Sequence, residues 1–418
     1  MKILWFVNQP LTENNISSTG SWLTSMAVGL SQKKNVELII ITDSEDVKSL
    51  TKIENNNWTQ WVFPSIKQKH GHFPVHITDQ ILKLIEVASP DLIHIWGIER
   101  AWAYNITRKN CCIPILIEMQ GIRYTCAQVF WGNLSPKEIR KCFSIREIIG
   151  YNSSLFSLRR KHYMWGFYEK KMLKDALYVS TQSDWCKEHI SLYTSIHTKF
   201  YSSRIAVREQ ISESDKWSVV SSHKQIFAIS NNSIPYKGLH ILIKAFALFS
   251  VKFPDFKLKI AGNIGHNKPF YRKSGYTKLL INMIKQYDLS DKVVFTGAID
   301  TSTLREELLN SAILVNPSFV ETYSMVLAEG MTMGVPCVVS YAGAMPELAE
   351  HNFSALFYTP WDYVSCASQM ERIIANKELA VKLSLNSINV CNERNNKEKL
   401  VANQMYIYND IINSHRLD

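Results

Sequence analysis

The sequence contains no long uncharged apolar run. None of its hydrophobic stretches approaches the roughly 18 residues that a membrane-spanning helix needs. The apolar start, Met1 to Val7, ends at Asn8, Gln9 and Pro10, which is too early for the apolar region of a secretion signal. We therefore expect a cytoplasmic protein without a membrane span.

Two cysteine patterns are also missing. The eight cysteines form no C-x-x-C pair and have no metal-like spacing with histidine, so we expect reduced cysteines in the core. The content of 16 glycines and 13 prolines, with 46% hydrophobic and 20% charged residues, excludes disordered, collagen-like and coiled-coil chains. The length of 418 residues favours two domains.

Positive charge is in excess and unevenly placed. The formal net charge is +10, which favours an anionic partner such as a phosphorylated metabolite, a nucleic acid or an acidic lipid surface. Between Arg123 and Lys174 there are eleven basic residues, three acidic residues and ten aromatic residues. This mixture suits a bilayer surface, and alternatives are a nucleic-acid backbone or solvated helices whose aromatic side chains turn into the core. We favour the anionic membrane over nucleic acid.

Short β-rich runs alternate with helical patterns, which is typical of βαβ units and parallel sheets. The predicted strands form two series, one before and one after the polar segment Glu209–His223, which we interpret as a linker. The strands are expected at 2–7, 36–42, 92–96, 115–119, 178–181, 225–230, 257–261, 293–296, 313–316 and 337–340.

This pattern predicts an α/β protein with two doubly wound, Rossmann-like domains. The first is expected over 1–212 and carries the basic aromatic segment as an insertion at 122–174. The second is expected over 220–395. The stretch 396–418 is expected to contain a helix that packs back on the first domain, because it has enough apolar positions to dock.

Candidate phosphate-binding and sugar-binding residues lie in the second half. Lys237 precedes Gly238 at a predicted helix start, where an ammonium group and free backbone N–H groups can bind a phosphate. Glu321 follows a predicted strand, and Glu329 lies eight residues later, about two helical turns on. Carboxylates at these positions can accept hydrogen bonds from sugar hydroxyls. For each residue taken alone, a surface lysine or a solvated glutamate is the simpler interpretation.

The motifs together resemble a known family. In order and spacing, K-G, N-P-S, E-x7-E, G-V-P and G-A-M-P-E over roughly 225–360 resemble the retaining group 4 glycosyltransferases, which include glycogen synthase-like and phosphatidylinositol mannosyltransferase-like enzymes. The resemblance implies the GT-B architecture, with two facing Rossmann-like domains and a deep cleft between them. The stretch from Gly121 to Asp184 looks like a bacterial surface-polysaccharide subgroup of this family.

The resemblance also implies an activity and its site. A glycosyl unit would move, with retention, from a nucleotide diphosphate sugar to a glycan hydroxyl, with an acceptor often carried on a polyprenyl diphosphate at the cytoplasmic face of the membrane. Lys237 and Glu321 would be catalytic. Neither a cofactor nor a metal is expected, and the sequence has no D-x-D motif. The residues implied to bind the donor are Gly20, Asn232, Lys237, Glu321, Tyr323, Ser324, Met325 and Glu329.

Two positions depart from the family pattern. Asn232 stands where the family usually has an arginine, and Gln120, on the acceptor side, stands where it usually has a histidine. Neither side chain carries a charge, so a lost charge-assisted contact would cost about 1.5–3 kcal/mol. These departures keep two alternatives open: a non-catalytic subunit that binds nucleotide or glycan as a scaffold, and a sugar-nucleotide epimerase.

Overall fold

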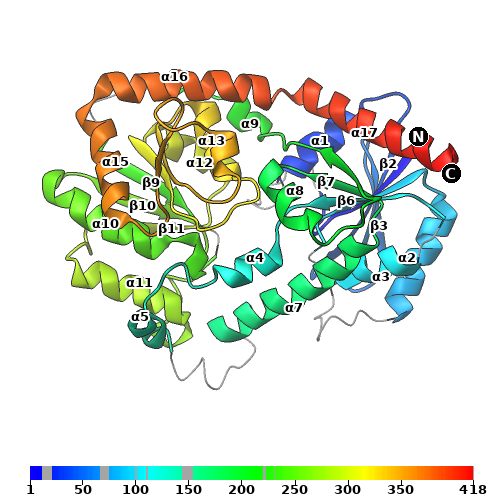
Figure 1. Cartoon of the computed structure of the whole chain (residues 1–418), viewed down its shortest axis with the longest axis horizontal. Coiled ribbons are helices and arrows are strands. Elements are labelled where there is room, and N and C mark those ends of the chain that lie inside the picture. Colours follow the sequence, from blue (N-terminus) through cyan, green and yellow to red (C-terminus); the bar gives the residue numbers. More distant parts are fainter. Residues whose placement is uncertain are drawn as a thin grey trace. The chain divides into compact units, whose positions relative to one another are not determined.

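The structure, a computed structural model, describes residues 1–11, 21–65, 75–98, 101–109, 112–143, 154–219, 223–230 and 232–417. The chain divides into two compact units (Figure 1). The first unit comprises Met1–Arg123, Met164–Ala206 and Asn395–Asp418, and the second comprises Tyr124–Tyr163 and Val207–Arg394. The predicted insertion 122–174 is therefore shared between the units.

The first unit contains one sheet of eight strands within its described residues. The strand order is β3-β4-β2-β1-β5-β6-β7-β8, and all neighbours are parallel except β3 and β4. The central strands are continuous apolar runs because helices cover both of their faces. The strands are β1 (Lys2–Phe6), β2 (Glu37–Ser44), β3 (Thr51–Glu54), β4 (Thr59–Pro64), β5 (Leu92–Trp96), β6 (Ile115–Met119), β7 (Tyr178–Thr181) and β8 (Lys199–Ser202).

The C-terminal helix α17 (Lys397–Leu417) packs in the first unit against α1 (Ser21–Ser31) (Figure 1). Its buried Tyr408 accepts a hydrogen bond from Trp5 Nε1 and lies 2.7 Å from His94 Nδ1. The apolar and aromatic positions on this helix thus bind it to the sheet. The other helices here are α2 (Val75–Ala88), α3 (Ala101–Lys109) and α8 (Asp184–Ser191), while α4 (Arg123–Gln128) and α7 (Leu155–Lys174) cross from one unit to the other.

The second unit has a parallel sheet of six strands in the order β11-β10-β9-β12-β13-β14. The first strand in sequence, β9, lies between β10 and β12, so the strand order reverses at this point. In open α/β sheets, ligands bind outside the carboxyl ends of the strands at such a switch point. The strands are β9 (Gln225–Ile229), β10 (Lys257–Ala261), β11 (Val293–Gly297), β12 (Ile313–Asn316), β13 (Cys337–Ser340) and β14 (Leu356–Tyr358).

Helices cover this second sheet and extend around it. Helix α10 lies beside α15, and α13 beside α16 (Figure 1). The helices are α5 (Pro136–Lys141), α9 (Glu209–Ser212), η1 (Pro235–Lys237), α10 (Leu239–Lys252), η2 (Phe270–Arg272), α11 (Gly275–Gln286), α12 (Thr301–Leu309), α13 (Met325–Met333), α14 (Met345–Leu348), α15 (Tyr363–Ala375) and α16 (Lys377–Arg394).

All ten predicted strands are present, to within two residues at their ends. Four strands escaped prediction, β3, β4, β8 and β14. Strand β3 is short and its side chains are largely exposed, and β14 has only three residues, so neither provides a clear apolar period.

The segment expected to be a linker is instead packed into the second unit. Ile211 is buried in α9. The Trp217 backbone N–H donates to the Met333 carbonyl at 2.8 Å, and its indole Nε1 donates to the Ser311 carbonyl at 2.7 Å. Its polar composition suggested a loop, but a few apolar side chains are enough to anchor it. Residues 220–222 of this segment lie outside the described residues.

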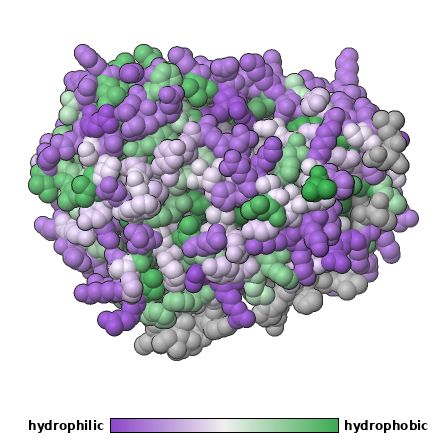
Figure 2. Space-filling view, in the orientation of Figure 1, coloured by the Kyte–Doolittle hydropathy of each residue, from purple (hydrophilic) through white to green (hydrophobic). Residues whose placement is uncertain are grey.

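On the face that Figure 2 shows, hydrophilic side chains predominate and hydrophobic ones are scattered among them. None of the described helices combines the length and the apolar composition needed to cross a bilayer.

Candidate functional site

Two loops meet at the switch point of the second sheet. One follows β9 and ends in the η1 turn, which carries Lys237, and the other follows β12 and carries Glu321. Gly238 allows their close approach, because a Cβ atom at this position would lie only 1.9 Å from the Pro317 carbonyl oxygen. Its φ of 72° lies in the left-handed region that favours glycine. The K-G pair therefore places the lysine against the turn after β12.

Lys237 and Glu321 form an ion pair at this point. The distance from Lys237 Nζ to Glu321 Oε1 is 2.7 Å, and both side chains are partly exposed, at 27% and 16%. The structure thus brings together the two residues predicted to be catalytic. A solvent-accessible ammonium that is held by a carboxylate can exchange that partner for a phosphate oxygen.

A third loop, after β13, holds the backbone of Glu321. The Ala344 N–H donates to the Glu321 carbonyl at 2.8 Å. Gly343 has a φ of 57°, and a Cβ atom there would lie 2.1 Å from the same carbonyl oxygen. The G-A-M-P-E motif therefore serves to place this loop directly against the turn that carries the carboxylate.

Asn316 and Ser324 organise the turn between β12 and α13. The Asn316 amide donates to Ser324 Oγ at 2.7 Å, and its carbonyl oxygen accepts from the Ser318 N–H at 3.2 Å. Ser324 is the N-cap of α13 and accepts from the Leu327 N–H. These contacts fix the direction of the start of α13, which carries the positive end of the helix dipole. Tyr323 and Ser324 are buried there, and Met325 is half-buried.

Glu329 lies on α13 and is almost completely buried, with 2% of its surface exposed. Its Oε1 is 2.7 Å from Arg208 Nε, and its Oε2 accepts from the second Arg208 terminal nitrogen at 3.5 Å. Burial raises the pKa of Glu329, and the charge of Arg208 opposes this rise. The E-x7-E spacing thus places one carboxylate beside Lys237 and the other beside a buried arginine.

Sequence reasoning missed Arg208. This residue is the N-cap of α9, is itself buried, and also donates to Thr301 Oγ1 at 3.1 Å. It stands 121 positions from Glu329 at the edge of the supposed linker. A single arginine at such a separation has no local pattern that connects it to the site.

The remaining predicted site residues lie in different surroundings. Asn232 is exposed, and its carbonyl accepts from Ser230 Oγ at 3.1 Å. The neighbouring Ser233 hydroxyl contacts Ser274 and Thr277, which ties this loop to the start of α11. Gln120 is half-buried just after β6 of the first unit. Gly20 lies outside the described residues.

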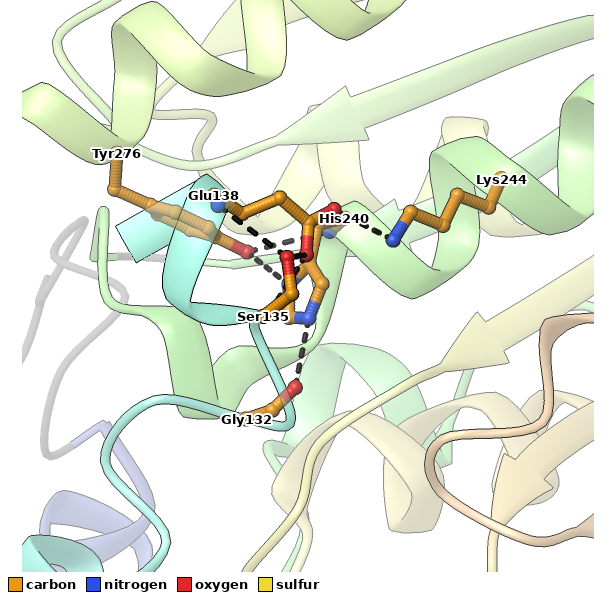
Figure 3. Close-up of polar contacts among 6 residues, drawn as sticks. All are labelled: Gly132, Ser135, Glu138, His240, Lys244 and Tyr276. Carbon is orange, nitrogen blue, oxygen red and sulfur yellow. Dashed lines mark hydrogen bonds and ion pairs between the residues drawn. The ribbon is translucent and has the colours of Figure 1, made fainter. Parts of the chain in front are cut away.

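The stretch from Tyr124 to Phe143 packs on the second unit beside this site. His240 at the start of α10 lies between Tyr276 and Gly132 (Figure 3). Its Nε2 is 2.7 Å from the Gly132 carbonyl oxygen, and its Nδ1 is 2.7 Å from the Tyr276 hydroxyl. Because a carbonyl oxygen only accepts, Nε2 carries the proton and Nδ1 accepts from the tyrosine. Burial lowers the pKa of His240 to about 4, which favours this neutral form.

An ion pair completes the attachment. Lys244 of α10 donates to Glu138 of α5 at 2.7 Å, and Ser135 caps the same short helix in a capping box with Glu138 (Figure 3). Burial would raise the pKa of Glu138, but the hydrogen bonds from Lys244 and Ser135 lower it to about 2. The Glu138 carboxylate is therefore ionised over the physiological pH range.

The described aromatic side chains of the basic segment range from buried to exposed. Phe130 is fully buried and packs against Tyr236, next to Lys237, with ring centres 6.1 Å apart. Four others are exposed, namely Phe143, Phe156, Tyr163 and Phe167, and the rings of Phe143 and Phe156 stack on each other. Phe130 therefore supports the turn that carries Lys237.

The cysteines within the described residues form no disulfide bond. Among the described residues, no group of three or more histidine, cysteine or acidic side chains is placed to hold a metal ion.

Comparison with solved structures defines the class of fold. Sucrose-phosphate synthase from Thermosynechococcus elongatus superposes with a TM-score of 0.75 and 14% identity over 99% of both chains. HepE of Anabaena, solved with UDP and glucose, superposes with a TM-score of 0.65 and 16% identity over 97% of this chain and 99% of its own. The two α/β units with parallel sheets therefore have the GT-B glycosyltransferase fold, as predicted.

Sequence comparison finds similarity in the second unit. Residues 211–390 match the model of the glycosyl transferases group 1 family. N-acetyl-alpha-D-glucosaminyl L-malate synthase of Bacillus anthracis is 24% identical over 51% of this chain and 52% of its own length. Protein CapJ of Staphylococcus aureus is 24% identical over 44% of this chain and 46% of its own. The chain spans about half the length of these relatives.

Proposed function

We propose that the protein is a retaining glycosyltransferase, which moves a sugar from a nucleotide diphosphate sugar to a glycan hydroxyl in cell-surface polysaccharide assembly. The observation that carries this proposal is the Lys237–Glu321 ion pair at the switch point of the second sheet, where the strand order reverses. A cation and a carboxylate side by side suit a donor that has a charged diphosphate next to a neutral sugar.

The proposed mechanism relies on electrostatic placement. Lys237, Asn232 and the N–H groups at the start of α13 stabilise the leaving diphosphate as its charge develops. Glu321 holds the donor sugar, and Glu329 accepts hydrogen bonds from the ribose. Attack on the same face as the departing phosphate accounts for retention without a covalent nucleophile. Because Lys237 supplies the positive charge, the reaction needs no bound metal.

Relatives support the class of donor. HepE was solved with UDP and glucose, and the name of the Bacillus anthracis relative, N-acetyl-alpha-D-glucosaminyl L-malate synthase, contains an N-acetylglucosaminyl group. We propose a uridine diphosphate hexose or N-acetylhexosamine as the donor class. The acceptor is proposed to be a glycan on a polyprenyl diphosphate at the cytoplasmic face of the membrane, which the basic, partly exposed α7 would approach.

A second candidate is a non-catalytic subunit that binds a nucleotide sugar. Asn232 favours this alternative, because it is exposed, has no positive charge and stands where the resemblance expects an arginine. A third hypothesis is a sugar-nucleotide epimerase. The presence of both glutamates of the E-x7-E motif argues against it.

The purified chain should be incubated with UDP-, GDP- and ADP-linked sugars in the presence of EDTA, and the products followed by NMR. A transferase slowly hydrolyses its donor to the sugar of unchanged anomeric configuration, and the Glu321→Gln variant loses this activity. Binding without turnover supports the scaffold, and a changed sugar in an intact nucleotide sugar supports the epimerase. If no nucleotide sugar binds, the proposed function is wrong.

A further inference from the structure

The buried partner of Glu329 has no role in the function proposed so far. Arg208 and Glu329 both lie in the second unit and are 8% and 2% exposed. The guanidinium contacts both carboxylate oxygens, at 2.7 Å and 3.5 Å. Burial of this pair removes the hydration of both ions, and a protein with well-packed apolar side chains in place of such a pair is often at least as stable. A purely structural contact gives little reason for an ion pair at this place.

The geometry leaves the carboxylate able to bind a second partner. An ionised carboxylate has about four lone-pair sites, and the guanidinium donates one hydrogen bond, to Oε2 at 3.5 Å. Glu329 Oε1 lies 2.7 Å from Arg208 Nε but has no hydrogen-bond partner among the described residues, so sites remain for two hydroxyl groups, such as the vicinal hydroxyls of a ribose. A protonated carboxyl would be less suitable, because it loses acceptor capacity and its negative charge.

We propose that Arg208 is a positioning residue for nucleotide binding, which keeps Glu329 ionised and oriented so that it can accept the ribose hydroxyls of the donor. This inference rests on the proposed function, in which Glu329 binds the ribose. The Arg208 terminal nitrogen also donates to Thr301 Oγ1 at 3.1 Å, so the guanidinium is held from a second element. Arg208 therefore acts through Glu329 and needs no contact with the nucleotide.

The charge balance around Glu329 makes this role testable by pH. Burial raises the pKa of Glu329, and Arg208 opposes that effect through its charge and its hydrogen bond. Two other titratable side chains near α13 have partners of their own. Glu307 of α12 pairs with Lys259, and Arg394 of α16 donates to the Leu348 carbonyl. The remaining titratable groups on the packed elements are Glu209, Arg305, Glu306, Cys337, Glu347, Lys377, Glu378, Lys382, Cys391 and Glu393.

Removal of Arg208 should therefore raise the pKa of Glu329 further. The carboxylate form exists above the pKa, so nucleotide affinity is lost as the pH falls through it, by up to about tenfold per pH unit. In an Arg208→Met variant, the loss of nucleotide affinity should occur at a higher pH than in the wild type. A neutral, buried carboxyl costs less than an unpaired buried charge, so the variant is expected to fold with Glu329 protonated.

The experiment is calorimetric titration of the full chain with UDP between pH 7 and pH 9, with each variant compared with the wild type at the same pH. We expect Arg208→Met to bind about tenfold or more weakly at pH 7 and to recover most of this loss by pH 9. Glu329→Gln should bind UDP weakly at every pH. The double variant Arg208→Met, Glu329→Gln should have the same affinity for UDP, because no carboxylate remains at position 329 to titrate. Circular dichroism checks that each variant is folded.

A conservative variant keeps the test valid if Arg208→Met does not fold. Arg208→Lys retains the charge but not the paired nitrogens, so we expect a smaller loss at pH 7 and the same recovery at high pH. A loss that is equal at all pH values in the folded variants, or wild-type affinity throughout, overturns the inference. If the wild type does not bind UDP, GDP or ADP, the proposed function fails instead, and the two failures remain distinct.

Discussion

At the scale of single residues, the site depends on a few charged contacts at loop ends. Lys237 has one short ion pair, with Glu321, and its backbone is held by the turn that Gly238 permits. A preorganised cation near a leaving diphosphate lowers the barrier because it need not reorganise as charge develops. In the proposed mechanism Asn232 is uncharged, so Lys237 would supply most of the side-chain charge for the phosphates.

Lys237→Ala is expected to reduce turnover about 10²-fold or more without unfolding the protein, because one preorganised electrostatic contact is lost. Steady-state kinetics with the donor found in the nucleotide-sugar panel measure this effect. Lys252→Ala is the matched control, since Lys252 has a similar 2.7 Å ion pair with Glu371 at an exposed position. Turnover within threefold of the wild type in Lys237→Ala would remove this residue from the mechanism.

At the scale of elements, the stretch from Tyr124 to Phe143 supports the turn that carries Lys237. Gly132 touches this turn, because a Cβ atom there would lie 2.5 Å from the Pro235 carbonyl oxygen, and Phe130 packs against Tyr236. A second close approach occurs at Gly275, where a Cβ atom would lie 1.7 Å from the Cys142 carbonyl oxygen. Helix α5 accordingly lies beside α11 (Figure 1).

Protonation of His240 in acid should weaken the packing of the stretch from Tyr124 to Phe143 within the second unit. The pKa of His240 is about 4 in the folded state and about 6.5 when the chain is unfolded, so its stabilising effect is complete above pH 6.5 and is lost as the pH falls toward 4. The nearby carboxylate of Glu138 does not titrate in this window, since its pKa is about 2.

His240→Leu is expected to destabilise the protein at pH 7, because the Gly132 carbonyl and the Tyr276 hydroxyl lose a buried partner, at about 1–3 kcal/mol each. The leucine does not titrate. The difference in unfolding free energy between wild type and variant should therefore shrink by about 1 kcal/mol between pH 7 and pH 5.5. Denaturant titrations at both values measure it, and a difference that stays constant contradicts the assigned protonation.

At the scale of the whole molecule, the surplus of positive charge is the main remaining feature. Helix α7 carries exposed Arg160 and Lys161 together with exposed Tyr163 and Phe167. Each basic side chain near an anionic leaflet contributes about 1 kcal/mol, and this attraction decays within a Debye length of about 8 Å. We propose that this helix holds the protein at the membrane surface as a peripheral protein.

The Arg160→Glu, Lys161→Glu variant should sediment with vesicles of anionic lipid about tenfold less than the wild type, while binding of the wild type should be reversed by high salt. Arg159 is left unchanged, because its guanidinium donates to the Ala127 carbonyl and to the Tyr163 hydroxyl. Lys33→Glu with Lys34→Glu is the control, since it makes the same charge change at exposed positions in the first unit. Equal binding by both double variants contradicts a membrane role for α7.

Much of the fold follows from local sequence. Short apolar runs such as Leu92–Trp96 and Ile313–Asn316 predicted buried parallel strands, because a strand that is covered on both faces reads as a continuous apolar run and these runs are too short for a buried helix. The K-G and E-x7-E motifs led to Lys237 and Glu321 through the family resemblance. The sequence did not predict their ion pair, which forms because the ends of β9 and β12 meet at the same edge of the sheet.

The tertiary structure decided what depends on contacts between distant positions. Only the folded chain shows that Arg208 pairs with Glu329, that Trp217 anchors the supposed linker, and that His240 holds Gly132 across 108 positions. The basic aromatic segment shows the same limit, because its composition does not reveal which rings pack inward. Local sequence determines strands, turns and motif positions through propensity and periodicity, whereas the partner of a buried charge or ring is chosen by packing, which the local pattern does not encode.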